Sequence, residues 1–154
     1  MDVLIVYGTT EGQTRKIAER TAMRVGEHGH WVELYDSASS ATNLDVSIFH
    51  AIIVAASVHQ ECHQDTIIDF AVAHRDQLSS KPTAFISVSL SAVLESEKRE
   101  AQKYVDRFVA TTCWQPQKIR PALHRIRLLS RADRQIHRYE GQPRCEQRAR
   151  SRVH

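Results

Sequence analysis

Three apolar runs of strand length, each containing β-branched residues, constrain the fold of this chain more than any other feature. They lie at residues 3–7, 51–56 and 83–88. Strands that are apolar along their length are typical of a parallel sheet covered on both faces. A fourth run, at residues 31–36, alternates in polarity and contains a charge, as an edge strand does. The pattern indicates four strands of a mainly parallel sheet.

Apolar stripes at helical spacing separate these strands. They occupy residues 17–25, 67–78 and 101–109, and Gly29 and Pro82 lie just beyond the first two. Alternation of strands with helices implies parallel crossover connections. We therefore predict an α/β fold with a doubly wound, open parallel sheet.

Charge divides the chain into two parts. Its 154 residues suffice for one domain with a single core, and its net charge is +3. Residues 120–154, however, hold ten arginines, no lysine and three acidic residues, a net charge of +7. Arg-rich sequence with little periodicity is typical of a disordered basic arm. We predict a folded domain at residues 1–118 and a basic tail at residues 119–154 that is poorly ordered or weakly helical.

Neither a signal peptide nor a membrane span is visible in the sequence. The longest stretch without Asp, Glu, Lys or Arg, residues 46–60, is too short to cross a bilayer. The N-terminus has an apolar run of only five residues, which is too short for a secretory leader. We expect a cytoplasmic protein.

The loop after the first predicted strand, residues 8–14, reads GTTEGQT and leads directly into a predicted helix. Open α/β sheets bind ligands at the carboxyl ends of their strands. The loop matches neither the dinucleotide motif nor the triphosphate-binding loop. Its hydroxyls, its glycine and the helix N-terminus could hold a phosphate without any lysine. On the residues alone, this interpretation and a simple helix cap followed by a turn are equally favoured.

Residues 7–18 resemble the flavin-phosphate loop of flavodoxins. Three later segments, residues 55–59, 84–90 and 104–116, match in order the flavodoxin-domain family that includes the menaquinone-dependent protoporphyrinogen oxidases. The resemblance covers about residues 2–118. It implies a flavodoxin-like sheet with strand order 2-1-3-4.

The resemblance also implies FMN as cofactor. The phosphate would lie on Thr9, Thr10, Glu11, Gly12, Gln13 and Thr14. The isoalloxazine ring would lie between the loop at residues 57–64 and the loop that begins at Ser89, with contacts to Ser57, Val58, His59, Ser89 and Leu90. By resemblance, the protein is an FMN-dependent oxidoreductase that oxidises protoporphyrinogen IX in haem biosynthesis and passes electrons to a quinone. Peripheral contact with the inner face of the membrane would accompany that role.

The chain departs from the family pattern at two places. The loop at residues 57–64 has no aromatic residue to stack on a flavin, and it carries Glu61. After residue 119 we recognise neither the family's fifth strand nor its closing helix, and a shifted reading frame or a truncated copy is our hypothesis for this change. A missing fifth strand would leave the fourth as an unpaired edge, which predicts low stability and self-association.

Three alternatives remain open. His59, Cys62 and His63 could ligate a metal, but such sites need three or four convergent ligands, so we assign none. The chain could be a flavin-free interaction module whose loop only caps a helix. It could also be a nucleic-acid binder acting through its basic tail, which we favour less. No catalytic residue is assigned.

Overall fold

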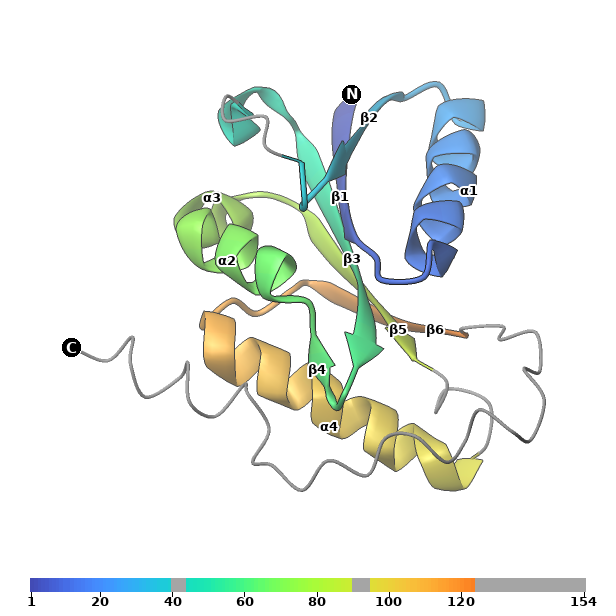
Figure 1. Cartoon of the computed structure of the whole chain (residues 1–154). Helices are drawn as coiled ribbons and strands as arrows, with labels where there is room; N and C mark the ends of the chain where they lie inside the picture. The colour runs from blue at the N-terminus through green and yellow to red at the C-terminus, as the bar shows by residue number, and fades with distance from the viewer. Residues whose placement is uncertain (40–43, 90–94, 124–154) are drawn as a thin grey trace.

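A parallel sheet organises the chain, seen in a computed structural model that describes residues 1–39, 44–89 and 95–123. Its strands follow the order β2-β1-β3-β5-β6, and each neighbouring pair is parallel (Figure 1). The predicted α/β fold with an open parallel sheet is confirmed. The strands are β1 (Asp2–Gly8), β2 (Trp31–Asp36), β3 (Ala51–His59), β5 (Thr83–Ser89) and β6 (Lys118–Leu123).

Helices cover both faces of this sheet, as the doubly wound arrangement requires. Helix α1 (Gln13–Glu27) packs on one face, where Ala18 and the half-buried Ile17 meet Val3 and Ile5 of β1. The opposite face carries the remaining helices, and Figure 1 shows the two groups on either side of the strands. Those helices are α2 (Asp65–Ala73), α3 (Arg75–Ser80) and α4 (Glu95–Thr112), with a short 3₁₀ helix, η1, at Val46–Ile48.

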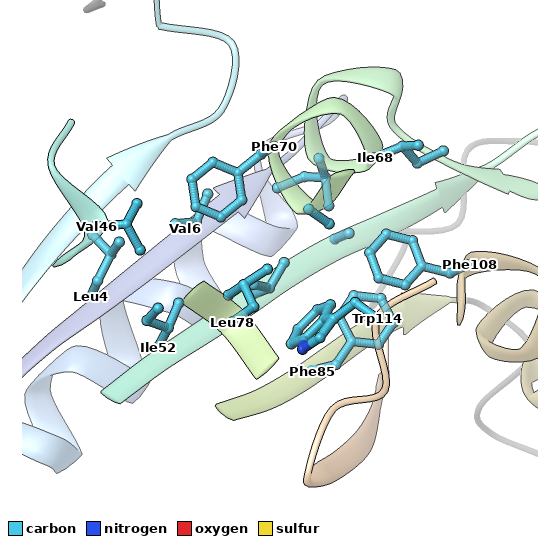
Figure 2. Packing of buried hydrophobic residues seen from close by; sticks show 14 of the residues in the cluster. Leu4, Val6, Val46, Ile52, Ile68, Phe70, Leu78, Phe85, Phe108 and Trp114 are labelled. Carbon is cyan, nitrogen blue, oxygen red and sulfur yellow. The ribbon is translucent and has the colours of Figure 1, made fainter. Parts of the chain in front are cut away.

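The larger core lies between the sheet and α2, α3 and α4 (Figure 2). Phe85 of β5 stacks on Phe108 of α4 with ring centroids 4.3 Å apart. Trp114, fully buried, meets both rings edge-on at 6.2 Å. Because β1 and β3 bury side chains on both faces, their sequences are apolar without alternation.

The predicted absence of a fifth strand is wrong. Strand β6 pairs with β5 in parallel register from Ala84 opposite Lys118 to Ser89 opposite Leu123. The edge of β5 that we expected to be exposed is therefore covered. The sheet also continues past the boundary predicted at residue 118, because residues 119–123 form a strand and not an irregular tail.

The sequence of β6, KIRPAL, conceals this strand for a physical reason. It lies at the end of the described strand order, so its backbone has a partner on one side only. Such a strand tolerates a proline and charged residues and needs no continuous apolar run. The closing helix and the order of the tail concern residues 124–154, which lie outside the described part of the chain.

Two local features differ from the predicted elements. A two-residue strand, β4 (Cys62–His63), returns antiparallel to β3 and makes a hairpin where we predicted a loop. The predicted helix at residues 67–78 is interrupted at His74, whose backbone leaves helical geometry between α2 and α3.

Candidate functional site

The predicted site residues that the structure describes gather at the carboxyl ends of β1, β3 and β5. Gly8, the last residue of β1, lies opposite Ala56 of β3, and Ser57 lies opposite Val88 of β5. The loop that follows β1 therefore lies beside the end of β3. Leu90 lies outside the described residues, and Ser89 is the last residue of β5.

The turn between β1 and α1 is held by a hydrogen bond to the side chain of Thr9. The backbone N–H of Gly12 donates to Thr9 Oγ1 at 2.8 Å. Gly12 has φ of +79°, a left-handed conformation that glycine adopts without steric cost. Thr9 thus shapes the turn, as the helix-cap alternative supposed, but it does not lie at the cap position of α1.

The N-terminus of α1 is suited to an anion. Its cap residue, Gly12, provides no side-chain cap, and its first turn contains no acidic residue. The nearest arginine along the chain, Arg15, pairs with Glu19 at 2.9 Å. The positive end of the helix dipole at this point favours a negatively charged group.

Thr14, in the first turn of α1, contributes a buried polar atom. The residue is fully buried, and its Oγ1 has no hydrogen-bond partner among the described residues. Ser89 at the end of β5 is likewise buried with an unpartnered Oγ. Buried hydroxyls without partners are uncommon, because each one costs about 1–3 kcal/mol. Two of them at one edge of the sheet are what a site for a polar ligand would show.

Gly8 brings α2 against this loop. A Cβ placed on Gly8 would lie 2.5 Å from Ile67 Cγ1 and 3.1 Å from both Gln64 Oε1 and Ser37 Oγ. Only glycine leaves room for this approach. Ser37, after β2, also hydrogen-bonds to Thr66 of α2 at 2.8 Å. One side of the candidate site is therefore formed by the ends of β1 and β2 together with the start of α2.

Gln64 is a site residue that we did not predict. Its Nε2 donates to Thr10 Oγ1 at 3.2 Å and to Ser57 Oγ, so it links the loop after β1 with the end of β3. Its Oε1 is buried and without a partner in the described part of the chain. One local signal could have indicated it, since a polar residue directly before an apolar helix, at the strand ends, is placed to reach a ligand.

On the ring side of the predicted site, the three residues from β3 differ in exposure. Ser57 is buried, Val58 is half-buried and His59 is exposed. The hairpin turn that follows is tied to α4, because Arg107 Nη1 donates to the carbonyl of Glu61 at 3.0 Å.

His63 is the register partner of Val58 in the β3–β4 hairpin, and its side chain packs into the larger core. It is buried, its Nε2 lies 3.0 Å from Ser87 Oγ, and its ring meets Phe85 and Phe108 edge-on. Burial lowers the pKa of His63 to about 3, so the ring is neutral at physiological pH. Across residues 1–39, 44–89 and 95–123, no three His, Cys, Asp or Glu side chains come together as metal ligands.

The domain is of the flavodoxin type. Its parallel sheet has the order β2-β1-β3-β5-β6, and a helix N-terminus and hydroxyl-bearing residues lie at the carboxyl ends of its strands. The family model described as a flavodoxin domain matches residues 4–128. The chain belongs to the flavodoxin-domain family, and the predicted resemblance is confirmed.

The similar curated proteins share one name within this family. The protein is similar to the protoporphyrinogen IX dehydrogenase [quinone] of Escherichia coli K12, with 29% identity over 118 residues, covering 75% of this chain and 64% of that protein. It is similar to the protein of the same name from Leishmania major, with 25% identity over 74% of this chain and 50% of that protein. The chain thus spans less than two thirds of the length of these relatives.

Solved structures support the fold. Oxidised flavodoxin 1 from Bacillus cereus superposes with a TM-score of 0.56 at 16% identity, covering 80% of this chain and 84% of that one.

None of the helices in the described ranges is both long enough and apolar enough to cross a bilayer.

Proposed function

We propose that the protein binds FMN and acts as a flavoprotein oxidoreductase. The observation that carries this proposal is the N-terminus of α1, which follows a self-shaped turn, lacks a side-chain cap from Gly12 and buries the unpartnered hydroxyl of Thr14. A phosphate placed there would accept hydrogen bonds from backbone amides and from that hydroxyl. Charge-assisted bonds of this kind contribute about 1.5–3 kcal/mol each, so the site needs no lysine.

Each residue then has a role in holding the cofactor. Residues 9–14 would hold the phosphate, with Thr14 Oγ1 directed at it and Glu11 at the exposed rim of the turn. The ring side would be formed by Ser57, Val58 and His59 of β3 and by Ser89 and Leu90. When bound, FMN supplies reversible two-electron redox chemistry. The hairpin at residues 57–64 carries no Phe, Tyr or Trp, so ring binding depends on backbone and polar contacts.

The substrate proposal comes from the relatives. Their printed name supports protoporphyrinogen IX as electron donor and a quinone as acceptor, which would place the protein in haem biosynthesis. A cytoplasmic location with peripheral membrane contact fits that role and stays a prediction. We no longer propose self-association through an exposed edge of β5, because β6 pairs with that edge.

A single substitution tests the phosphate site. Thr14→Val removes the unpartnered hydroxyl and keeps the shape of the side chain. We expect FMN affinity to fall about tenfold, because one charge-assisted hydrogen bond is lost. We also expect the apoprotein to gain about 1 kcal/mol of unfolding free energy, because a buried unsatisfied group is removed. FMN fluorescence titration and urea unfolding measure the two effects.

The matched control is Thr21→Val, on the same helix. Thr21 lies about two turns along the helix from Thr14, and its Oγ1 donates to the carbonyl of Ile17 at 2.8 Å. This variant should leave FMN affinity unchanged. Equal FMN binding by Thr14→Val and the wild type would refute the proposed phosphate contact, and no FMN binding by the wild type would favour the flavin-free alternative.

A further inference from the structure

Gln64 links the two halves of the proposed site. Its side chain spans from Thr10, in the loop after β1, to Ser57, near the end of β3. The proposed phosphate position lies on the first of these segments and the proposed ring position beside the second. A chain of atoms that connects phosphate to ring would therefore run near Gln64.

The side-chain amide oxygen of Gln64 is a buried acceptor that a ligand could satisfy. Gln64 Oε1 is buried and receives no hydrogen bond from the described residues, although its own Nε2 is engaged twice. It lies beside the backbone of Gly8, 3.1 Å from the point where a Cβ would be. A buried acceptor without a donor is unfavourable, and a ligand that brings an O–H to this point would relieve it.

Both the backbone of Gln64 and its side-chain amide are held by hydrogen bonds, so this acceptor is positioned before any ligand arrives. The N–H groups of Ile67 and Ile68 both donate to the carbonyl of Gln64 at 3.1 Å, which anchors the residue to the first turn of α2. Ile67 in turn packs against Gly8. A positioned polar group of this kind contributes to binding without a large ordering cost.

We propose that Gln64 is a specificity-determining residue whose Oε1 accepts a hydrogen bond from a hydroxyl of the polyol chain that joins phosphate to ring. The inference rests on the proposed function, and it adds that the site selects a hydroxylated linker and not only a phosphate and a ring. A flavin phosphate whose linker lacks hydroxyls would leave Gln64 Oε1 without a donor.

A double-mutant cycle tests this contact. Its ligands are FMN and an FMN analogue with a plain pentamethylene chain in place of the ribityl chain. Its variants are Gln64→Met, which has similar length but no acceptor, and the wild type. We expect the preference for FMN over the analogue to fall about fivefold in Gln64→Met, the effect of one buried neutral hydrogen bond.

Two further variants make the readout specific. Gln64→Glu keeps an acceptor, so it should keep the preference for FMN while binding both ligands more weakly through repulsion of their phosphates. Gln117→Met changes an exposed glutamine just before β6, at the opposite edge of the sheet, and should change neither affinity nor preference. A structural role of Gln64 would weaken both ligands equally in Gln64→Met.

The outcomes separate this inference from the proposed function. The role of Oε1 would be overturned if Gln64→Met kept the wild-type preference for FMN over the analogue. It would also be overturned if Gln64→Glu lost as much of that preference as Gln64→Met. FMN binding by the wild type would stand in both cases. No binding of either ligand by the wild type would overturn both. Should Gln64→Met fail to fold, the side-chain amide signals of Gln64 in wild-type NMR spectra decide: they should shift with FMN and not with inorganic phosphate, and no shift with FMN overturns the proposal.

Discussion

The hairpin between β3 and β4 holds two residues with side chains, Gln60 and Glu61, in the left-handed backbone region, with φ of 49° and 64°. Two-residue hairpin loops with positive φ at both positions strongly favour glycine and asparagine. The loop at residues 57–64 therefore contains backbone strain at the end of β3, next to the proposed ring position. The sequence gives no sign of this turn, because neither residue is a usual turn former.

Replacing Glu61 with glycine should relieve part of that strain. We expect Glu61→Gly to raise the free energy of unfolding by about 1 kcal/mol, since a side chain at positive φ costs about 1–2 kcal/mol. The bond from Arg107 is to the backbone carbonyl and survives the change. Urea unfolding measures the effect. Glu33→Gly, an exposed position within β2, is the matched control and should lower stability; a loss of stability in Glu61→Gly as well would contradict this account.

His63 should make stability depend on pH. Its pKa is lowered by burial from 6.5 to about 3, so the folded state binds fewer protons than the unfolded state between these values. Stability is therefore complete above pH 6.5 and falls as the pH drops towards 3. Between pH 7.5 and pH 5 we expect a loss of about 2 kcal/mol, at about 1.4 kcal/mol per pH unit once the pH is well below 6.5.

The variant His63→Gln isolates this contribution from that of the other histidines. The stability difference between wild type and variant should shrink by about 2 kcal/mol over the same pH interval. A difference that stays constant from pH 7.5 to pH 5 would mean that His63 is not buried in neutral form.

At the scale of elements, β1, β2, β3 and β5 could be predicted, whereas the edge strand β6 could not. Strands β1, β3 and β5 are covered by helices or sheet neighbours on both sides, so burial dictates their composition. Strand β6 is positioned by long-range pairing with β5 and by the packing of Ile119 against the core. Neither contact leaves a periodic pattern in the sequence. Gln64 was missed although its place directly before an apolar helix was a local signal, because its contact with Thr10, 54 residues away, forms only in the folded chain.

The placement of β6 predicts different effects at adjacent positions. Ile119 is half-buried against the core and Lys118 is exposed. We expect Ile119→Ala to lower the free energy of unfolding by about 1–3 kcal/mol, because buried apolar area is lost. Lys118→Ala should change it by less than about 0.5 kcal/mol, as exposed sites usually do. Chemical denaturation compares the two, and equal effects would argue against β6 as part of the folded sheet.

For the whole molecule, the sequence predicted the family, which is confirmed, and a ligand site at the carboxyl ends of the strands, which stays a prediction. Both follow from features close together in the chain: apolar strands, and a loop that leads straight into a helix. The sequence could not show that Thr9 would fold back on Gly12 or that the hydroxyl of Thr14 would be buried without a partner. Those contacts are what turn a generic helix start into a candidate phosphate site.

The central claim is that the N-terminus of α1 binds a phosphate through amides and hydroxyls. Isothermal titration with FMN and with riboflavin, which differ only in that phosphate, tests it most directly. We predict that FMN binds at least about 100-fold more tightly, an advantage of about 2.7 kcal/mol that two charge-assisted hydrogen bonds suffice to supply. Equal affinities for the two flavins would contradict the claim.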